Sequence, residues 1–166
     1  MTDRPPPVSD GVVYADGPDR TLLALDAATG DERWTLETAS EDPGFSVAVR
    51  QGTVYAACSS ELVALDRSDG AVRWRRSAQT LSATADGADP DASLDEVLVT
   101  DDRLYAELGE GLASLSLTDA SVEWYRPFPG GASGDVVLSG SPVGTAVTET
   151  TVLAFTAATD VVALGR

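Results

Sequence analysis

The sequence predicts an all-β protein built from about four copies of one repeat. Three tryptophans, Trp34, Trp74 and Trp124, occupy one position in three aligned segments. Short runs of alternating apolar and polar residues, separated by turn residues, are typical of β-strands, and no helical pattern exceeds one or two turns. The tryptophans are spaced by 40 and then 50 residues. A period of this length with four strands per copy is typical of the blades of a β-propeller.

The first copy contains three clear strand candidates. They are residues 12–16, 22–26 and 32–37, and residues 7–10 are the only candidate for a strand before them. A turn from Asp26 to Gly30 joins the last two. The Asp side chain at the start of such a turn accepts hydrogen bonds from the following amides, and the glycine adopts the positive φ that closes the hairpin.

The second and third copies repeat this order with a strand candidate in front. The expected strands are residues 45–50, 53–57, 62–66 and 71–76, then 96–100, 103–107, 112–117 and 121–126. Asp66 and Gly70 repeat the turn of the first copy. In the third copy Ser116 and Ala120 replace the Asp and the Gly, so we expect a less regular turn there.

The fourth copy is incomplete. Residues 143–148 and 151–155 are strand candidates, but the sequence ends just after Ala163 and Leu164, before a turn, a fourth strand or a tryptophan. We therefore expect one domain, residues 1–166, with blades at about 7–38, 44–79, 95–129 and 142–166. The connectors Ser77–Asp95 and Pro127–Ser141 are rich in small and polar residues, and we interpret them as solvated surface loops.

Charge and composition exclude several classes of function. The net charge is −16, and the 11 basic residues are all arginine. Such a surface repels nucleic acid and anionic membranes. The chain has no histidine, which excludes an imidazole base or a histidine metal ligand within it. The single cysteine, Cys58, excludes an internal disulfide and is expected to be an inert thiol.

Two local clusters have a structural and a functional interpretation. Asp86, Asp89, Asp91 and Asp95 suggest calcium, but no EF-hand spacing follows, so a solvated acidic loop is the better interpretation. Arg73, Arg75 and Arg76 flank Trp74, and we expect them to pair with nearby carboxylates rather than bind a ligand.

The acidic composition favours adaptation to high salt, with simple solubility as the alternative. Many Asp, Ala, Thr and Val residues and no Lys resemble the proteins of halophilic organisms. In molar salt the Debye length falls to about 3 Å, which removes most of the self-repulsion. No apolar stretch suits a targeting signal or a membrane span, so the expected location is cytoplasmic.

The repeats resemble the pyrroloquinoline-quinone-like (PQQ-like) β-propeller family with its tryptophan-docking motif. Residues 22–34 read LLALDAATGDERW, and residues 62–74 read LVALDRSDGAVRW. The third copy matches more weakly. The resemblance implies that the three tryptophans pack between adjacent blades against a small residue. The small residues at that position are Ala24, Ala64, Ser114 and Ala163.

The resemblance does not assign a reaction to this chain. The quinone enzymes of the family use a calcium ion, a catalytic Asp and adjacent cysteines, whereas this chain has one cysteine and no asparagine. No catalytic, cofactor-binding or metal residue can be placed, so we expect no enzyme activity and no cofactor. The expected function is a non-catalytic module for binding or assembly. The alternatives are a fragment of a quinone-dependent dehydrogenase-type propeller or of a longer repeat protein.

The number of repeats leaves ring closure open. Four blades make either a small closed ring or half of an eight-bladed ring. A half ring has open blade faces, and large apolar faces favour association. We expect the half ring, completed by a second copy or by a further part of the chain. Its open blade faces are expected to bind a protein partner or another copy.

Overall fold

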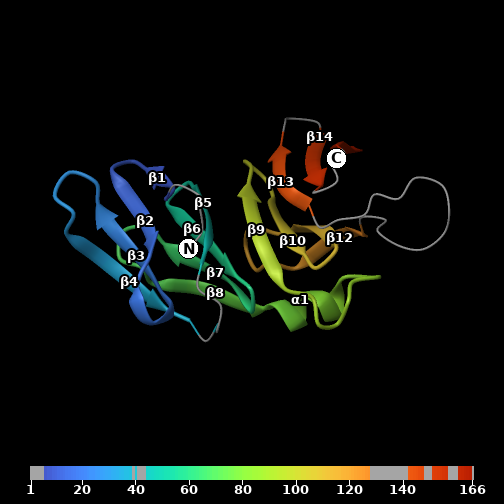
Figure 1. The fold of residues 1–166 in the computed structure, drawn as a ribbon, viewed down its shortest axis with the longest axis horizontal. Helices are drawn as coiled ribbons and strands as arrows, with labels where there is room; N and C mark the ends of the chain where they lie inside the picture. The colour runs from blue at the N-terminus through green and yellow to red at the C-terminus, as the bar shows by residue number, and fades with distance from the viewer. Residues whose placement is uncertain are drawn as a thin grey trace.

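The computed structural model describes residues 6–38, 40, 44–127, 142–147, 151–156 and 161–165, the last three ranges as backbone only. Four antiparallel sheets follow one another along the chain, here called blades 1 to 4. They form a curved row in which blades 1 to 3 follow one another from left to right and blade 4 lies above blade 3 (Figure 1). The predicted all-β fold of repeated four-stranded sheets is confirmed.

Each of the first three blades contains four strands in chain order, and blade 4 contains three in the described residues. Blade 1 comprises β1 (Val8–Ser9), β2 (Val12–Asp16), β3 (Thr21–Asp26) and β4 (Glu32–Glu37). Blade 2 comprises β5 (Ser46–Arg50), β6 (Thr53–Cys58), β7 (Glu61–Asp66) and β8 (Val72–Ser77). Blade 3 comprises β9 (Leu94–Val99), β10 (Leu104–Leu108), β11 (Gly111–Leu115) and β12 (Val122–Pro127). Blade 4 comprises β13 (Pro142–Val147), β14 (Thr151–Thr156) and β15 (Val161–Gly165).

The register between the third and fourth strands shifts at the same place in all three complete blades. The shifts follow Ala24, Ala64 and Ser114. A bulge at this point bends the fourth strand and sets which of its residues lies opposite the small residue. As a result Trp34, Trp74 and Trp124 are each the direct cross-strand partner of that small residue.

The apolar core lies between the blades rather than inside any one of them. One cluster joins blade 1 to blade 2, and a second joins blade 2 to blade 3. All six residues of β6 and all five of β10 are buried, whereas β2 alternates between buried and partly exposed positions. The inner blades are therefore covered on both faces, and blade 1 is covered on one.

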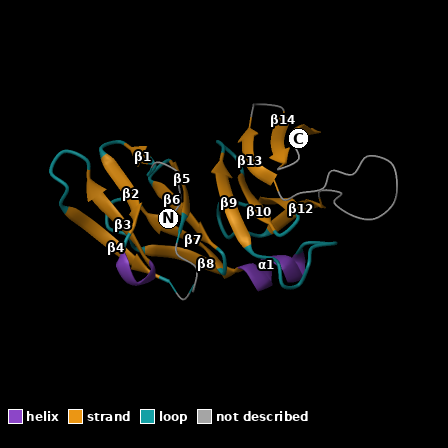
Figure 2. Cartoon of the chain, viewed as in Figure 1, coloured by secondary structure: helices purple, strands orange, loops and turns teal. Residues whose placement is uncertain are grey.

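The connector Ser77–Asp95 is not a solvated loop throughout, so that expectation was wrong. It contains the helix α1 (Ala78–Thr84), which is labelled in Figure 2. The Ser77 hydroxyl caps this helix by accepting a hydrogen bond from the amide of Thr80. Leu81 is buried in the second core cluster. Ala78, Leu81 and Ala85 recur at helical spacing and share one face, a pattern too short to stand out in the sequence.

The other helical segment, η1 (Pro18–Arg20), is a single 3₁₀ turn between β2 and β3. None of the helices in the described part of the chain is long and apolar enough to cross a membrane. Most of the second connector, residues 128–141, lies outside the described residues.

The turns between the third and fourth strands follow one hydrogen-bonding scheme. In blade 1 the Asp26 carboxylate accepts hydrogen bonds from the amides of Ala28 (2.9 Å) and Thr29 (3.1 Å). Gly30 closes the turn with φ +78° and donates its amide to the Asp26 carbonyl at 2.8 Å. In blade 2 the Asp66 carboxylate accepts the amide and the hydroxyl of Ser68, and Gly70, with φ +73°, donates its amide to the Asp66 carbonyl at 2.9 Å.

The third turn keeps the same geometry, so the expectation of a less regular turn was wrong. The Ser116 hydroxyl accepts the amide of Thr118 at 3.2 Å, in the role of the Asp carboxylate. Ala120 takes the glycine position with φ +56°, and its amide donates to the Ser116 carbonyl at 3.0 Å. A left-handed alanine costs about 1 kcal/mol, which the surrounding backbone hydrogen bonds and the burial of Ala120 offset.

The turn carboxylates predict a loss of stability in acid. Hydrogen bonds from Arg33 and from two backbone amides lower the pKa of Asp26 to about 2. The Ser68 hydroxyl and Arg73 lower the pKa of Asp66 in the same direction. A carboxyl whose folded pKa is depressed stabilises the protein fully above its unfolded pKa, near 4, and loses that contribution as the pH falls through the folded pKa. We expect the free energy of unfolding to fall from pH 4 downward.

Urea unfolding of wild type and Asp66→Asn across this pH range measures the effect. The variant lacks the titrating carboxyl, so its stability should change less with pH than that of wild type. Asp91→Asn removes the same charge from the connector and is the matched control. Equal slopes for wild type and Asp66→Asn would contradict the assignment.

Candidate functional site: the contacts between blades

Each complete blade carries a row of three residues across its strands: a tyrosine, a small residue and a tryptophan. In blade 1, Ala24 of β3 lies directly between Tyr14 of β2 and Trp34 of β4. Because Ala24 has no bulk, the two rings meet above it, with centroids 5.9 Å apart and planes tilted by 47°. This tilted arrangement is a favourable aromatic geometry. Blades 2 and 3 repeat the row with the residues Tyr55, Ala64, Trp74 and Tyr105, Ser114, Trp124.

Trp34 extends from this row into the next blade. Its indole Nε1 donates to the carbonyl oxygen of Arg67, in the turn of blade 2, at 2.9 Å. The indole lies close against Gly70, since a Cβ at that glycine would come within 2.8 Å of two indole carbons. Only glycine satisfies both the positive φ of +73° and this close approach. The Trp34 side chain is 6% exposed.

Trp74 makes the same contact with blade 3 in a looser form. Its Nε1 donates to the carbonyl of Leu117, which corresponds to Arg67, at 3.2 Å. Ala120 occupies the position of Gly70 and is buried in the core cluster against which Trp74 packs. Trp74 is partly exposed where Trp34 is buried.

The described contacts of Trp124 lie within blade 3. Its ring contacts Tyr105 at 6.0 Å between centroids, and the Arg126 guanidinium lies 5.8 Å from its ring centroid. Ala163 corresponds to Ala64, so the position of blade 4 that matches Gly70 lies beyond Gly165, the last described residue. Ala163 is described only as backbone, where it pairs with Leu153 as Ala24 pairs with Tyr14.

Polar contacts that the sequence did not reveal also join the blades. Asp10 of blade 1 forms an ion pair with Arg67 of blade 2. Arg50 of blade 2 forms one with Asp101 of blade 3. The Asp16 carboxylate of blade 1 accepts the amide of Phe45 at 3.0 Å. The two partners of each pair lie in different copies of the repeat, so no short sequence motif contains them both.

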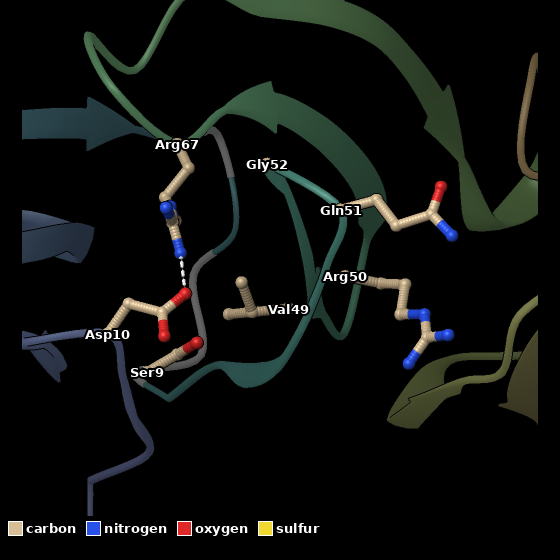
Figure 3. A pocket seen from close by; sticks show the side chains of 7 residues that line it. All are labelled: Ser9, Asp10, Val49, Arg50, Gln51, Gly52 and Arg67. Atoms are coloured by element: carbon tan, nitrogen blue, oxygen red, sulfur yellow. Dashed lines mark hydrogen bonds and ion pairs between the residues drawn. The ribbon is translucent and has the colours of Figure 1, made fainter.

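An open pocket of about 390 Å³ lies where the turns of blades 1 and 2 meet. Figure 3 shows Asp10 and Arg67 pointing toward each other on one side, while Arg50 and Gln51 point away from that pair. Since Asp10 and Asp101 neutralise the two arginines, the pocket has no excess positive charge to hold an anion. The nearby Tyr14 ring is buried, and this burial raises the pKa of its hydroxyl.

The arginines near Trp74, two aspartates of the connector and Cys58 all contact other groups of the protein. Arg73 pairs with Asp66 at 2.7 Å and Arg75 with Glu61 at 3.0 Å, which confirms the expected pairing with carboxylates for these two arginines. Arg76 instead donates to the carbonyl of Arg75 at 3.0 Å. The Asp91 amide donates to the carboxylate of Asp89. Cys58 is buried, and its thiol donates to the Glu61 carbonyl at 3.6 Å. Among the described side chains, no group of three or more acidic or cysteine residues is arranged to hold a metal ion.

A row of antiparallel blades with this repeated aromatic contact defines a β-propeller repeat protein. A family model described as "Outer membrane protein assembly factor BamB" matches residues 2–164. The chain belongs to this family, whose repeats are of the PQQ-like propeller type. The resemblance drawn from the tryptophan repeats is thereby confirmed.

Individual proteins show the same fold in longer chains. BamB from Moraxella catarrhalis is 20% identical, with a TM-score of 0.64, over 93% of this chain and 46% of that one. The quinohemoprotein alcohol dehydrogenase of Comamonas testosteroni is 20% identical, with a TM-score of 0.59, over 74% of this chain and 20% of that one. The computationally designed Ika4 protein is 9% identical, with a TM-score of 0.68, over 95% of this chain and 87% of its own.

One curated protein matches part of the sequence. The serine/threonine-protein kinase AfsK of Streptomyces griseus is 38% identical over 74 residues, which are 42% of this chain and 9% of the kinase. The chain thus spans a small part of that relative and about half of the Moraxella protein.

Two glycines at corresponding positions allow the tryptophan contact to be tested. Gly30 and Gly70 both have positive φ, but a Cβ at Gly30 meets nothing within 4 Å, whereas one at Gly70 collides with the Trp34 ring. Gly30→Ala should therefore cost only the backbone strain, about 1 kcal/mol. Gly70→Ala should cost about 1–3 kcal/mol more, because the indole must move. Urea unfolding of the two variants measures the difference, and equal costs would show that the indole contact contributes nothing.

Proposed function

We propose that the chain is a non-catalytic propeller module that acts as a scaffold for protein binding or assembly. The observation that carries this proposal is that the residues repeated from copy to copy contact one another within and between blades. The tyrosine–small residue–tryptophan rows and the turn residues are engaged in this way. The family model, described as an assembly factor, supports the same class of function.

In this proposal the tryptophans act as docking groups and have no chemical role. Trp34, Trp74 and Trp124 hold successive blades together, seated beside Ala24, Ala64 and Ser114, and Ala163 holds the same place in blade 4. Asp26, Gly30, Asp66 and Gly70 fix the turns whose carbonyls and glycines meet the indoles. The fold then presents its turns and open blade faces to a protein partner or to another copy of the chain. Nucleic acid is a poor partner for a chain of charge −16.

The second candidate is a piece of a quinone-dependent dehydrogenase-type propeller. The structural likeness to the Comamonas enzyme favours it, although at 20% identity this likeness supports only a shared fold. The third candidate, a piece of a longer repeat protein, accords with the match to about half of the Moraxella chain. The cytoplasmic location stays a prediction from the sequence.

Titration calorimetry with pyrroloquinoline quinone and Ca²⁺ separates the scaffold from the enzyme. We expect no saturable heat from the quinone, because no described cluster of side chains offers a metal and quinone site. A titration with Ca²⁺ alone is the control for weak binding of the cation to the acidic surface. Saturable micromolar binding of the quinone would overturn the scaffold proposal.

We further propose that the acidic surface is an adaptation to high salt. Raising KCl from about 0.1 M to molar levels shortens the Debye length from about 10 Å to 3 Å, which relieves repulsion among the carboxylates. The melting temperature should therefore rise with KCl. An equal concentration of a neutral solute such as sucrose is the control for solute exclusion effects. A melting temperature indifferent to KCl would leave solubility as the reason for the charge.

A further inference from the structure

The two faces of blade 1 differ in what covers them. One face, with Tyr14 and Trp34, packs against blade 2. The other face is apolar too, and its residues are only partly exposed. They are Val13, Ala15, Leu23 and Leu25, called here the outer face of blade 1. The register places them side by side, because Val13 pairs with Leu25 and Ala15 pairs with Leu23.

Blade 2 shows what the same face looks like when it is covered. Val54, Ala56, Val63 and Leu65 correspond by repeat position to the outer face of blade 1, and each is 0–1% exposed. They belong to the core cluster that also contains Tyr14 and Trp34. The outer face of blade 1 therefore has the composition of a blade-to-blade interface. It uses the same repeat positions as the face by which blade 2 packs against blade 1.

The turns of the two blades show the same contrast. At Gly70 of blade 2, the Trp34 indole fills the space that a side chain would take. At the corresponding Gly30 of blade 1 that space is empty, since a Cβ there meets nothing within 4 Å. In the described structure, no blade covers this side of blade 1.

The arrangement of the row indicates which surface fits this face. Blade 1 is the first blade of the row and blade 4 is the last (Figure 1). In the junctions of blades 1–2 and 2–3, the face that carries the tyrosine and the tryptophan meets the opposite face of the next blade. The outer face of blade 1 is such an opposite face, so by repeat position it fits the tyrosine–tryptophan side of another blade. The row spans 46% of the matching Moraxella chain, so two rows supply about the length of that one propeller.

We propose that the outer face of blade 1 binds blade 4 of a second copy of this chain. Blade 4 of the first copy meets blade 1 of the second in the same way, so the two contacts close a two-fold ring of eight blades. Closed two-fold assemblies are the commonest form of soluble homo-oligomer. This inference rests on the proposed scaffold function and names the partner of its open face.

The assembly depends on salt for a physical reason. Each copy has a net charge of −16, so two copies repel each other at low ionic strength. Molar KCl screens this repulsion, and the attraction between the apolar faces then outweighs it. The dimer should therefore form in molar KCl and weaken as the salt is diluted.

Sedimentation velocity of the full chain in 2 M KCl tests the proposal. We expect wild type to sediment with about twice the chain mass of 17.2 kDa. Leu23→Glu places a charge in the outer face and should raise the dissociation constant at least about tenfold. Val13→Glu is a second variant on the same face, in case one of them fails to fold. Val72→Glu is the matched control, because Val72 is 47% exposed on blade 2 and should leave the dimer intact.

The outcomes separate this inference from the proposed function. Near-ultraviolet circular dichroism checks that each variant keeps the tilted tyrosine–tryptophan contacts. A folded wild-type monomer at high salt would overturn the inference and favour a compact four-blade ring. A dimer that survives both Leu23→Glu and Val13→Glu would overturn it too, because the contact would lie elsewhere. Quinone binding would overturn the scaffold function whichever mass is found.

Discussion

The structure depends on one constraint: a four-stranded sheet with two apolar faces cannot cover either of them by itself. Each blade must therefore lie against a neighbour, and the core forms between blades. The Trp34 indole shows how specific this contact is, since it combines a hydrogen bond to the Arg67 carbonyl with close contact to Gly70. The glycine turn, the bulge after Ala24 and the small residue itself are all needed to bring that ring to that place.

Much of this arrangement could be predicted from the sequence, because the strands recur with a fixed period. The tryptophan spacing revealed the repeat, and the Asp–Gly turns marked the hairpins within it. The turn from Ser116 to Ala120 escaped prediction, because local propensity favours Asp and Gly while the backbone hydrogen bonds of the hairpin impose the turn on other residues. The helix α1 escaped too, since seven residues give too short a pattern to separate from a loop.

The contacts between blades were harder to predict than the blades themselves. Arg67 pairs with Asp10, although 57 residues separate them. Arg50 and Asp101 likewise come from different copies. A single sequence indicates which residues share a face of a strand, but not which turn of one blade lies beside which turn of another. Among the sites, the tryptophan and small-residue positions were predictable because they repeat, whereas the pocket beside Arg67 was not.

The helix α1 makes the junctions of this row unequal. Units that contact only their neighbours have a stability that is close to the sum of the stabilities of the units and of their junctions. The junction of blades 1 and 2 relies on a closely seated indole, whereas that of blades 2 and 3 has a looser indole and adds Leu81 from the segment that links the two blades. A contact made by the linking segment closes a short loop, and short loops form at lower entropic cost. The two junctions of blade 2 therefore differ in construction, since one depends mainly on a closely seated indole and the other also on a buried helix in the linking segment.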